Sequence, residues 1–367
     1  MSKSKTLFVT GSTGNLGREL VKRFLERTSD RLLLLVRPSA SESHEARVSK
    51  LLAKMGTNGN SKSRVEVLAG DVSRPRLGLS EKDWFRVMEE TDEIYHAAAL
   101  TNLGAKWDEA EKINLAGTVH ILELAKAAHR QGKLKRYFHF STAYVAGSLT
   151  PLRALEDRLP EAPVFANAYE ETKFLAEKKV REAQAEGLPV IIFRPSIVVG
   201  DSVRGAVSEF NVIYPFMRIF AHGLLRKLPS RLENSFNIVP IDFVVEASLA
   251  IAAQPESLGK TFHLVTENPP TLGMLLQVKE EFGSHFPSVE VVEPDQFEIE
   301  TLNEQEKMIF SSLDPYLGYL GSTLSFDTMN TRRALKETPV PLPNTDLGFI
   351  RKLIGYAMEK GYFLSAA

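Results

Sequence analysis

Two side chains one helical turn apart could perform acid–base chemistry. Tyr169 and Lys173 are four residues apart, a spacing that places both on one face of a helix. A free phenol has a pKa of about 10 and is a poor proton donor or acceptor near neutral pH. A neighbouring ammonium favours the phenolate and lowers that pKa. We expect Tyr169 to give its proton to an oxyanion that forms in a substrate.

The same spacing occurs in Tyr356 and Lys360, so the pattern alone is not specific. Context separates the two pairs. Tyr169 follows a segment that ends in Ser141-Thr142 and precedes an apolar run that ends at Arg194, whereas the second pair lies near the C-terminus. We interpret Tyr356 and Lys360 as a pair on a helix surface.

Other polar side chains could complete this chemistry. Ser141 or Thr142 could donate a hydrogen bond to the same substrate oxygen as Tyr169. Because neighbouring strand residues point to opposite faces, only one of the two can do so, and the sequence leaves the choice open. Asn114 could hold a water or a backbone carbonyl beside Lys173, or its amide could satisfy an irregularity in a helix.

A glycine-rich loop predicts a dinucleotide site. Gly11, Gly14 and Gly17 lie between a strand-like run and a helical stretch. They permit a tight turn, a close approach of the backbone to a pyrophosphate and helix packing on a sheet, while the helix N-terminus attracts phosphate. The loop residues assigned to the cofactor are Gly11, Ser12, Thr13, Gly14, Asn15, Leu16 and Gly17.

Arg37 indicates which nicotinamide cofactor binds. It ends the second strand-like run, where an NAD site usually has a carboxylate for the ribose hydroxyl. A guanidinium there would pair with a 2′-phosphate, so we predict NADP(H), with Arg47 as a second phosphate ligand. The alternative for both arginines is an ordinary solvated charge.

The positive charge of the nicotinamide ring of the bound cofactor would, together with Lys173, further favour the phenolate of Tyr169.

Further cofactor contacts are expected where strands end. Asp71 and Val72 are placed to meet the adenine, and small residues follow the fourth strand, where the cofactor must pass. The remaining assigned residues are Ala97, Ala98, Ala99, Lys173, Pro195, Ser196 and Ile197.

The first 200 residues alternate between apolar runs and stretches with helical period. The runs are apolar on consecutive positions, which is typical of strands covered on both faces of a parallel sheet. We predict a doubly wound, Rossmann-type α/β fold. The predicted strands are Thr6–Thr10, Leu32–Val36, Val65–Ala69, Glu93–His96, Arg136–Ser141 and Val190–Arg194, and the first helix is Asn15–Ser29.

The alternation of apolar runs and stretches with helical period becomes less regular after residue 200. We predict an NADP-binding core over 1–200 and a smaller substrate-binding α/β cap over 201–367, with 236–265 returning to the core. In the cap we expect an acidic, solvated segment over Ser288–Lys307. The predicted helices are Phe210–Leu228, Leu272–Phe282 and Leu347–Lys360, and a single strand is predicted at Thr261–Val265.

Composition excludes several classes of function. The 367 residues are 43% hydrophobic and 25% charged, with a net charge of -1, which gives no field for attracting nucleic acid. No apolar run reaches the length of a membrane span, and the polar start leaves no room for a signal peptide. With no cysteine and no zinc-type histidine spacing, we expect no metal and a reducing, cytoplasmic location.

These motifs together resemble an extended short-chain dehydrogenase/reductase, from Lys5 to about Val265. The glycine spacing, Tyr169 and Lys173 match that family, and Thr142, five residues before Gly147, matches the position of its catalytic hydroxyl. The resemblance therefore implies Thr142, Tyr169, Lys173 and Asn114 as the catalytic set.

Within that superfamily the chain is most similar to thioester reductases: the terminal domains of carboxylic acid reductases and peptide synthetases, and fatty acyl-CoA reductases. Leu35-Val36-Arg37-Pro38, the segment from Asn114 to Thr118, the segment from Phe138 to Gly147, and Ser325-Phe326-Asp327-Thr328 carry this similarity.

The resemblance implies NADPH-dependent reduction of an acyl thioester to an aldehyde, and possible further reduction to an alcohol. Acyl-CoA or an acyl carrier protein would supply the substrate, since the chain includes no adenylation or carrier domain. One alternative is an enzyme that reduces a ketone or aldehyde, or oxidises a hydroxyl, on a lipid-like substrate. A second is a sugar-nucleotide epimerase or dehydratase, which Arg37 opposes. A third is a redox-sensing protein that binds NADP without turnover.

One basic stretch bears on the donor of the substrate. Arg218, His222, Arg226, Lys227 and Arg231 interrupt an apolar run. They could contact a carrier protein, the phosphates of coenzyme A or a membrane surface that the chain does not span. The alternative is an amphipathic lid whose basic residues are solvated. The sequence predicts no oligomeric state.

Overall fold

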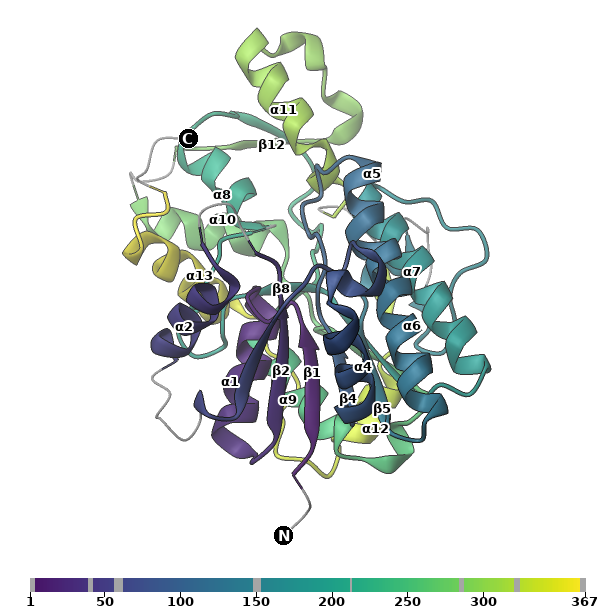
Figure 1. Ribbon diagram of the computed structural model, residues 1–367. Coiled ribbons are helices and arrows are strands. Elements are labelled where there is room, and N and C mark those ends of the chain that lie inside the picture. The colour runs from purple at the N-terminus through teal and green to yellow at the C-terminus, as the bar shows by residue number, and fades with distance from the viewer. Residues whose placement is uncertain are drawn as a thin grey trace.

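The centre of the computed structural model is a seven-stranded sheet in which each neighbouring pair is parallel, in the order β11-β7-β5-β4-β1-β2-β3 (Figure 1). The structure describes residues 4–38, 42–55, 62–147, 153–211, 213–283, 287–319 and 324–363, without the side chains of residues 54, 314 and 315. The strands are β1 (Thr6–Thr10), β2 (Arg31–Val36), β3 (Val65–Ala69), β4 (Glu93–His96), β5 (Arg136–Phe140), β7 (Val190–Pro195) and β11 (Thr261–Leu264).

Consecutive apolar residues form these strands because both faces of the sheet are covered. In β2, Leu32 and Leu34 belong to one apolar cluster, whereas Leu33 and Leu35 belong to another on the opposite face. The helices that cover the first face are α1 (Asn15–Arg27), α2 (His44–Lys54) and α9 (Ile241–Ala252); those that cover the second are α4 (Glu81–Glu90), α6 (Ala116–Arg130) and α7 (Ala168–Ala185). The predicted doubly wound fold is confirmed.

The order of the strands creates a crevice beside β1. The chain continues from β1 to β2 and β3 on one side, and then crosses to β4 and β5 on the other. Thr10, at the end of β1, therefore lies between Leu35 of β2 and His96 of β4. Ligands of open α/β sheets bind at such a reversal, outside the carboxyl ends of the strands.

A third apolar cluster lies beyond the carboxyl ends of the strands. It is built by α8 (Ile213–Ala221), α10 (Leu272–Glu281), α11 (Glu304–Leu317) and α13 (Leu347–Glu359), and α11 projects farthest from the sheet (Figure 1). The short strands β9 (Lys227–Pro229) and β12 (Glu290–Val292) pair beside it. We call these elements the cap.

The chain passes more than once between the cap and the sheet. After β8 (Ile197–Val199) it enters the cap, and it returns through β10 (Ile238–Pro240), which pairs with β8, and through α9 and β11. A second return, which the sequence did not predict, brings β13 (Ser325–Phe326) against β6 (Arg153–Ala154) and α12 (Met329–Leu335) against α9 and β11. The predicted boundaries of core and cap remain a prediction.

The helix expected over Phe210–Leu228 is wrong in length. The structure has α8 only over Ile213–Ala221, and the chain then continues into β9. Gly223 adopts a φ of +62°, a conformation that stops a helix and reverses the chain. In the acidic segment, β12 is followed by two short 3-10 helices and the start of α11, and Glu290 and Glu293 pair with Lys227 and Arg231.

Two features of the described residues concern membrane spans and metal sites. The described helices include none that combines the length and apolar composition needed to cross a bilayer. No group of three or more histidine, aspartate or glutamate side chains in this part of the chain is arranged to hold a metal ion.

Candidate active site

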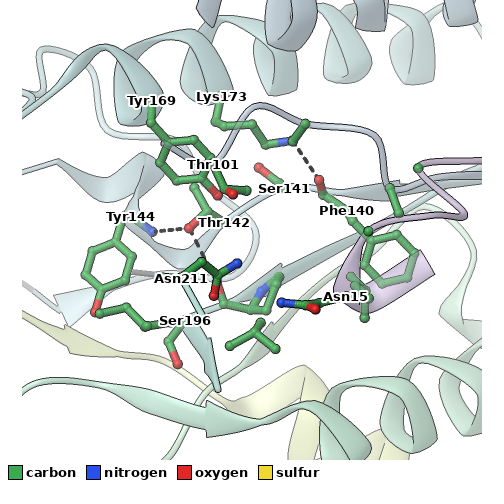
Figure 2. Close-up of a pocket in the computed structure, with 18 of the residues that line it drawn as sticks. Asn15, Thr101, Phe140, Ser141, Thr142, Tyr144, Tyr169, Lys173, Ser196 and Asn211 are labelled. Atoms are coloured by element: carbon green, nitrogen blue, oxygen red, sulfur yellow. Dashed lines mark hydrogen bonds between the residues drawn. The ribbon is translucent and has the colours of Figure 1, made fainter. Parts of the chain in front are cut away.

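A pocket at the carboxyl ends of β1, β4 and β5 brings together the three side chains expected to act on a substrate. Tyr169, Lys173 and Thr142 all line it, and Figure 2 shows them converging from α7 and from the end of β5. Asn167 fixes the start of α7, because its side chain accepts a hydrogen bond from the backbone N–H of Glu170 at 3.0 Å. This N-cap hydrogen bond starts α7 at Ala168, so that Tyr169 lies in the first turn of the helix.

Lys173 is buried, with 2% of its surface exposed. Its Nζ donates a hydrogen bond of 2.7 Å to the carbonyl of Phe140, the last residue of β5. Burial lowers the pKa of Lys173 to about 8, although the charge of Glu177 acts in the opposite direction. The side chain thus joins α7 to the strand end and is close to titration under mildly alkaline conditions.

The pKa of Tyr169 differs from the sequence-based expectation. Burial raises this pKa to about 12, while a hydrogen bond with Thr142 partly opposes the rise. The expected lowering by Lys173 is therefore not found, because the ammonium is directed at the carbonyl of Phe140. The phenol is neutral at pH 7 and carries the proton that a reduced substrate would need.

The structure distinguishes between the two adjacent hydroxyls. Thr142 Oγ1 accepts a hydrogen bond from the backbone N–H of Tyr144 at 3.3 Å, beside Tyr169. Ser141 Oγ instead donates to Glu177 Oε2 at 2.7 Å. Thr142 Oγ1 also donates to the carbonyl of Pro195, but at 3.4 Å this contact is much longer than the bond between Ser141 and the buried carboxylate. Thr142 is therefore the hydroxyl that can more readily turn to a substrate oxygen.

Asn114 lies in a short π-helix, Glu111–Leu115. Its amide accepts from the backbone N–H of Leu100 at 2.8 Å and donates to the carbonyl of Leu100 at 3.2 Å and to Thr172 Oγ1 at 3.1 Å. These bonds go to the segment after β4, including a backbone carbonyl, and to the residue next to Lys173, rather than to the π-helix itself. The catalytic role of Asn114 stays a prediction.

The glycines of the loop let its backbone pack closely against the segment after β4 and the start of α1. Gly11 has a φ of +73°, and a Cβ there would lie 2.6 Å from the backbone nitrogen of Ala98. A Cβ on Gly17 would overlap the carbonyl of Gly11. Gly14 caps α1 without a side chain, so the first N–H groups of the helix face the pocket without competition from a side-chain cap.

The two predicted phosphate ligands lie together in a second hollow, which continues from the first. Arg47 donates to the carbonyl of Arg37 at 2.5 Å and to Thr13 Oγ1 at 3.3 Å, so it ties the end of β2 to the glycine loop. Asp71 also lines this hollow and accepts a hydrogen bond from the backbone N–H of Ser73 at 2.9 Å.

Apart from Ser12 and Asn114, every predicted site residue lines one of the two hollows. The first is lined by Gly11, Gly14, Asn15, Leu16, Gly17, Ala97, Ala99, Thr142, Tyr169, Lys173, Pro195, Ser196 and Ile197. The second is lined by Gly11, Thr13, Gly14, Arg37, Arg47, Asp71, Val72, Ala97, Ala98 and Ala99. The buried hydroxyl of Ser196, which lines the first hollow, has no hydrogen-bond partner among the described residues, as expected of a group placed to meet a polar ligand.

Several residues of the site were not predicted. Tyr144, Asn211 and Tyr319 line the catalytic pocket, and Tyr319 packs edge-to-face on Tyr144 at 4.7 Å between ring centroids. Tyr144 lies in the short 3-10 helix Ala143–Ala146, within the segment that carries the family similarity, although no role was predicted for it. Asn211 lies in a loop and Tyr319 just after α11, and no motif marks these two. Glu177 could have been found, because it follows Lys173 by one helical turn on the same face.

A comparison with known families decides the relationship that the motifs suggested. Residues 9–248 match the family described as male sterility protein, an NAD-binding family. The chain belongs to this family. It is an extended short-chain dehydrogenase/reductase and an oxidoreductase, which confirms the relationship inferred from the sequence.

Several characterised proteins share this similarity. The chain is 28% identical to a nonribosomal peptide synthetase of Aspergillus flavus, over 90% of this chain and 34% of that protein. It is 30% identical to a fatty acyl-CoA reductase of Drosophila melanogaster, over 68% of this chain and 54% of that protein. A carboxylic acid reductase of Mycobacterium marinum is also 30% identical, over 74% of this chain and 25% of that protein.

Among solved structures, the terminal R domain from the myxalamid PKS-NRPS biosynthetic pathway superposes with a TM-score of 0.85 at 28% identity, covering 99% of this chain and 93% of that one. The chain spans only about a third of the peptide synthetase of Aspergillus flavus and about half of the acyl-CoA reductase. It is thus homologous to a reductase domain within larger proteins.

Proposed function

We propose that this chain reduces an acyl thioester to an aldehyde, with NADPH as the hydride donor and Tyr169 as the proton donor. The observation that carries the proposal is the convergence of Tyr169, Thr142 and Lys173 in a pocket that is continuous with the arginine-lined hollow. Homology to peptide synthetase reductase domains and to acyl-CoA and carboxylic acid reductases supports the substrate class.

The residues present fit a nicotinamide dinucleotide phosphate. The loop at the start of α1 would hold the pyrophosphate through its backbone N–H groups, and Arg37 with Arg47 would pair with the 2′-phosphate. Ser196, which lines the first hollow, offers a buried hydroxyl that lacks a partner among the described residues. When bound, NADPH supplies the hydride that reaches the carbonyl carbon.

The polar residues of the pocket would stabilise the negative charge on the carbonyl oxygen and supply its proton. Thr142 and Tyr169 would donate hydrogen bonds to the carbonyl oxygen, which becomes an oxyanion as the hydride arrives. Tyr169 then gives its proton to that oxygen, and the ammonium of Lys173 stabilises the phenolate left behind.

The product is then released. When the carbon–sulfur bond of the hemithioacetal breaks, its hydroxyl proton returns to Tyr169, and the leaving thiolate takes a proton from water. One thioester, one NADPH and one proton thus give one aldehyde, one free thiol and NADP+. Since the sequence contains no cysteine, no cysteine acyl-enzyme intervenes. Reduction of the aldehyde to an alcohol would use the same groups.

The thiol part of the substrate is coenzyme A or the pantetheine arm of a carrier protein. This choice follows the peptide synthetases and the fatty acyl-CoA reductase among the relatives. Both donors share the pantetheine thiol.

The test uses the purified chain with NADPH and acyl-pantetheine or acyl-CoA thioesters, while the absorbance of the reduced nicotinamide and the free thiol are followed together. We expect one thiol released for each NADPH oxidised. Oxidation of NADPH by a ketone but by no thioester would contradict the proposal. Tightly bound NAD in the purified protein would instead favour an epimerase.

A further inference from the structure

A buried histidine that the proposed reaction does not use lies between the start of the glycine loop and α6. His96 is the last residue of β4 and is 1% exposed. Its Nδ1 lies 2.8 Å from the Oγ1 of Thr10, at the end of β1, and its Nε2 lies 3.1 Å from the Oγ1 of Thr118, on α6. Each ring nitrogen therefore has a hydroxyl partner in the interior of the core.

The other partners of the two threonines determine where the proton of the ring lies. Thr118 donates its only hydroxyl proton to the carbonyl of Asn114 at 2.6 Å, so its oxygen can only accept from the Nε2–H of His96. Thr10 Oγ1 accepts from the backbone N–H of Ala98 at 3.3 Å and keeps its own proton for Nδ1. The hydrogen bonds thus assign a neutral ring with its proton on Nε2.

The surroundings of His96 also favour a neutral ring. Burial, and with it the charge of Lys173, lowers the pKa of His96 to about 3. The ring of His139 lies 5.6 Å away between centroids, and burial holds its pKa well below the usual range. Because His96 gains no proton near neutral pH, its two hydrogen bonds keep their direction.

On its Nδ1 side, His96 supports the passage expected for the cofactor. Thr10 immediately precedes Gly11, and a Cβ on Gly11 would lie 2.6 Å from the backbone nitrogen of Ala98. The glycine loop and the segment after β4 are therefore in close contact where both line the arginine-lined hollow. The hydrogen bonds from Ala98 to Thr10 and from Thr10 to His96 hold these two walls together.

On its Nε2 side, His96 supports the residue that precedes Lys173. The carbonyl that Thr118 binds belongs to Asn114, in the short π-helix. The side chain of Asn114 in turn donates to Thr172 Oγ1 at 3.1 Å. A line of hydrogen bonds therefore leads from the ring, through α6 and the π-helix, to the backbone beside Lys173 on α7.

We propose that His96 is a positioning residue which, through one fixed tautomer, holds the glycine loop with Nδ1 and the surroundings of Lys173 with Nε2. The inference rests on the proposed function, which places the cofactor on the glycine loop and gives Lys173 its role. The two sides are separable, because each ring nitrogen serves one of them. Loss of the bond at Nδ1 should weaken cofactor binding, and loss of the bond at Nε2 should change Lys173.

The tautomer is the first test. In the full chain labelled with ¹⁵N-histidine, the nuclear magnetic resonance signals of His96 are those that disappear in His96→Gln. We expect a proton on Nε2, none on Nδ1, and no change between about pH 5.5 and 9. A proton on Nδ1, or titration near the ordinary histidine pKa of about 6.5, would overturn the proposal.

Threonine-to-valine substitutions test the two sides one at a time. Thr10→Val should raise the dissociation constant for NADPH at least about fivefold, the usual effect of one lost hydrogen bond, and leave the pKa of Lys173 near 8. Thr118→Val should change that dissociation constant less than about twofold. It should instead raise the pKa of Lys173 by at least about 0.5 toward its ordinary value, because a less tightly packed ammonium is better hydrated.

Fluorescence titration measures the dissociation constant, and the carbon resonance of ¹³Cε-lysine, assigned by its loss in Lys173→Arg, follows the pKa of Lys173. Thr91→Val is the matched control. Thr91 is also fully buried, but its hydroxyl has no hydrogen-bond partner in the part of the chain that the structure describes. This variant should change neither quantity.

Substitutions of His96 itself should reproduce the division. The amide of glutamine reaches the position of Nε2 and that of asparagine the position of Nδ1, so His96→Gln should resemble Thr10→Val and His96→Asn should resemble Thr118→Val. If the variants change both quantities together, in step with their loss of stability in urea, or change neither, the proposal fails. Neither measurement uses turnover: a chain that shows the division but reduces no thioester would disprove the proposed reaction and keep the role of His96.

Discussion

At Tyr169, burial and hydrogen bonding act on the phenol in opposite directions. Burial raises its pKa to about 12, and the hydrogen bond with Thr142 limits the rise. A phenol that keeps its proton at pH 7 suits a reduction, in which the substrate oxygen must gain a proton after hydride transfer. Lys173 lines the same pocket and is held on the carbonyl of Phe140, so stabilisation of the phenolate by its ammonium would be measured as a lower pKa of Tyr169.

Tyr169→Phe tests this role directly. The variant keeps the ring and loses the proton, so we expect kcat to fall by roughly 10²–10⁴-fold, the usual contribution of a general acid. The dissociation constant for NADPH should change little, which fluorescence titration measures. Tyr356→Phe serves as the control, because Tyr356 has the same spacing to a lysine as Tyr169; its activity should stay close to wild type. An unchanged rate in Tyr169→Phe would rule out the assignment.

The pH profile reports on Lys173. Because its pKa is lowered to about 8, the ammonium is lost as the pH rises through that value, and with it the stabilisation of the phenolate. We expect kcat to fall with a midpoint near pH 8. Lys173→Arg should lower the maximum rate but move this alkaline fall to higher pH, since a guanidinium stays charged. A profile that is flat to pH 10 in the wild type would contradict the role of the ammonium.

Arg37→Ala tests the choice of cofactor. The guanidinium would bind a phosphate that NADPH carries and NADH lacks, and a charge-assisted hydrogen bond contributes about 1.5–3 kcal/mol. We expect the dissociation constant for NADPH to rise roughly 10–150-fold and that for NADH to change less than about threefold, measured by fluorescence titration. Arg47→Ala should weaken both cofactors, because Arg47 also holds Thr13 of the glycine loop. Equal loss of NADPH and NADH in Arg37→Ala would remove the phosphate assignment.

Individual residues were predictable to different degrees. The lining of the pocket by Tyr169 and Lys173 followed from helical spacing and from the strands that flank them. The family resemblance indicated Thr142 rather than Ser141, but the local pattern left the choice open, because the hold of Glu177 on Ser141 arises only in the tertiary structure. The pKa of Tyr169 depended on burial, which no local pattern gives.

Among the elements, α7 connects the site to β7, next to the edge strand β11, through buried charges. Glu177 is fully buried and accepts hydrogen bonds from Arg194 of β7 at 2.6 and 3.0 Å and from Arg181 at 2.8 Å. Arg194 also donates to the carbonyl of Leu155 at 2.9 Å. Burial alone would raise the pKa of Glu177, but Arg194 and Arg181 hold it well below its usual range.

Glu177→Gln should therefore destabilise the fold. The amide leaves Arg194 as a buried charge without its carboxylate, and breaking a buried pair in this way costs about 3–5 kcal/mol. Urea unfolding at pH 7 measures the loss. The wild-type protein should lose this stabilisation below about pH 4.5, where an unfolded glutamate takes up its proton. Glu182→Gln, which removes an exposed pair with Lys179 on the same helix, should cost less than about 0.5 kcal/mol; equal losses would contradict the structural role of Glu177.

Strands and helices differed in how far the sequence determined them. The six predicted strands of the first 200 residues were found because strands buried on both faces are mostly apolar at consecutive positions, as in β2. The helix expected from Phe210 was too long, because apolar residues continue past Gly223 into β9. There burial in the cap, and the pairing of β9 with β12, override the helical pattern.

At the scale of the whole molecule, repeated crossings of the chain join core and cap. The segment 325–335 returns from the cap to β6, β11 and α9. Glu156 fixes this return, because its carboxylate accepts hydrogen bonds from His263 N at 2.9 Å and from Thr331 Oγ1 at 2.8 Å. The sequence predicted one return, around residue 236–265, and missed the second, because β13 has only two residues and carries no periodic pattern.

These crossings predict that core and cap unfold together. Both tryptophans, Trp84 and Trp107, lie in the predicted core, whereas far-ultraviolet circular dichroism also reports the helices of the cap. In urea the two signals should give one coincident transition, the mark of cooperative unfolding, and NADPH at about 100 times its dissociation constant should stabilise both by about 2.7 kcal/mol. A cap that folded independently would lose circular dichroism at lower urea than fluorescence, with only the fluorescence transition moved by NADPH. Glu156→Gln should bring the protein toward that second behaviour, because it weakens the contact that returns α12 to the sheet.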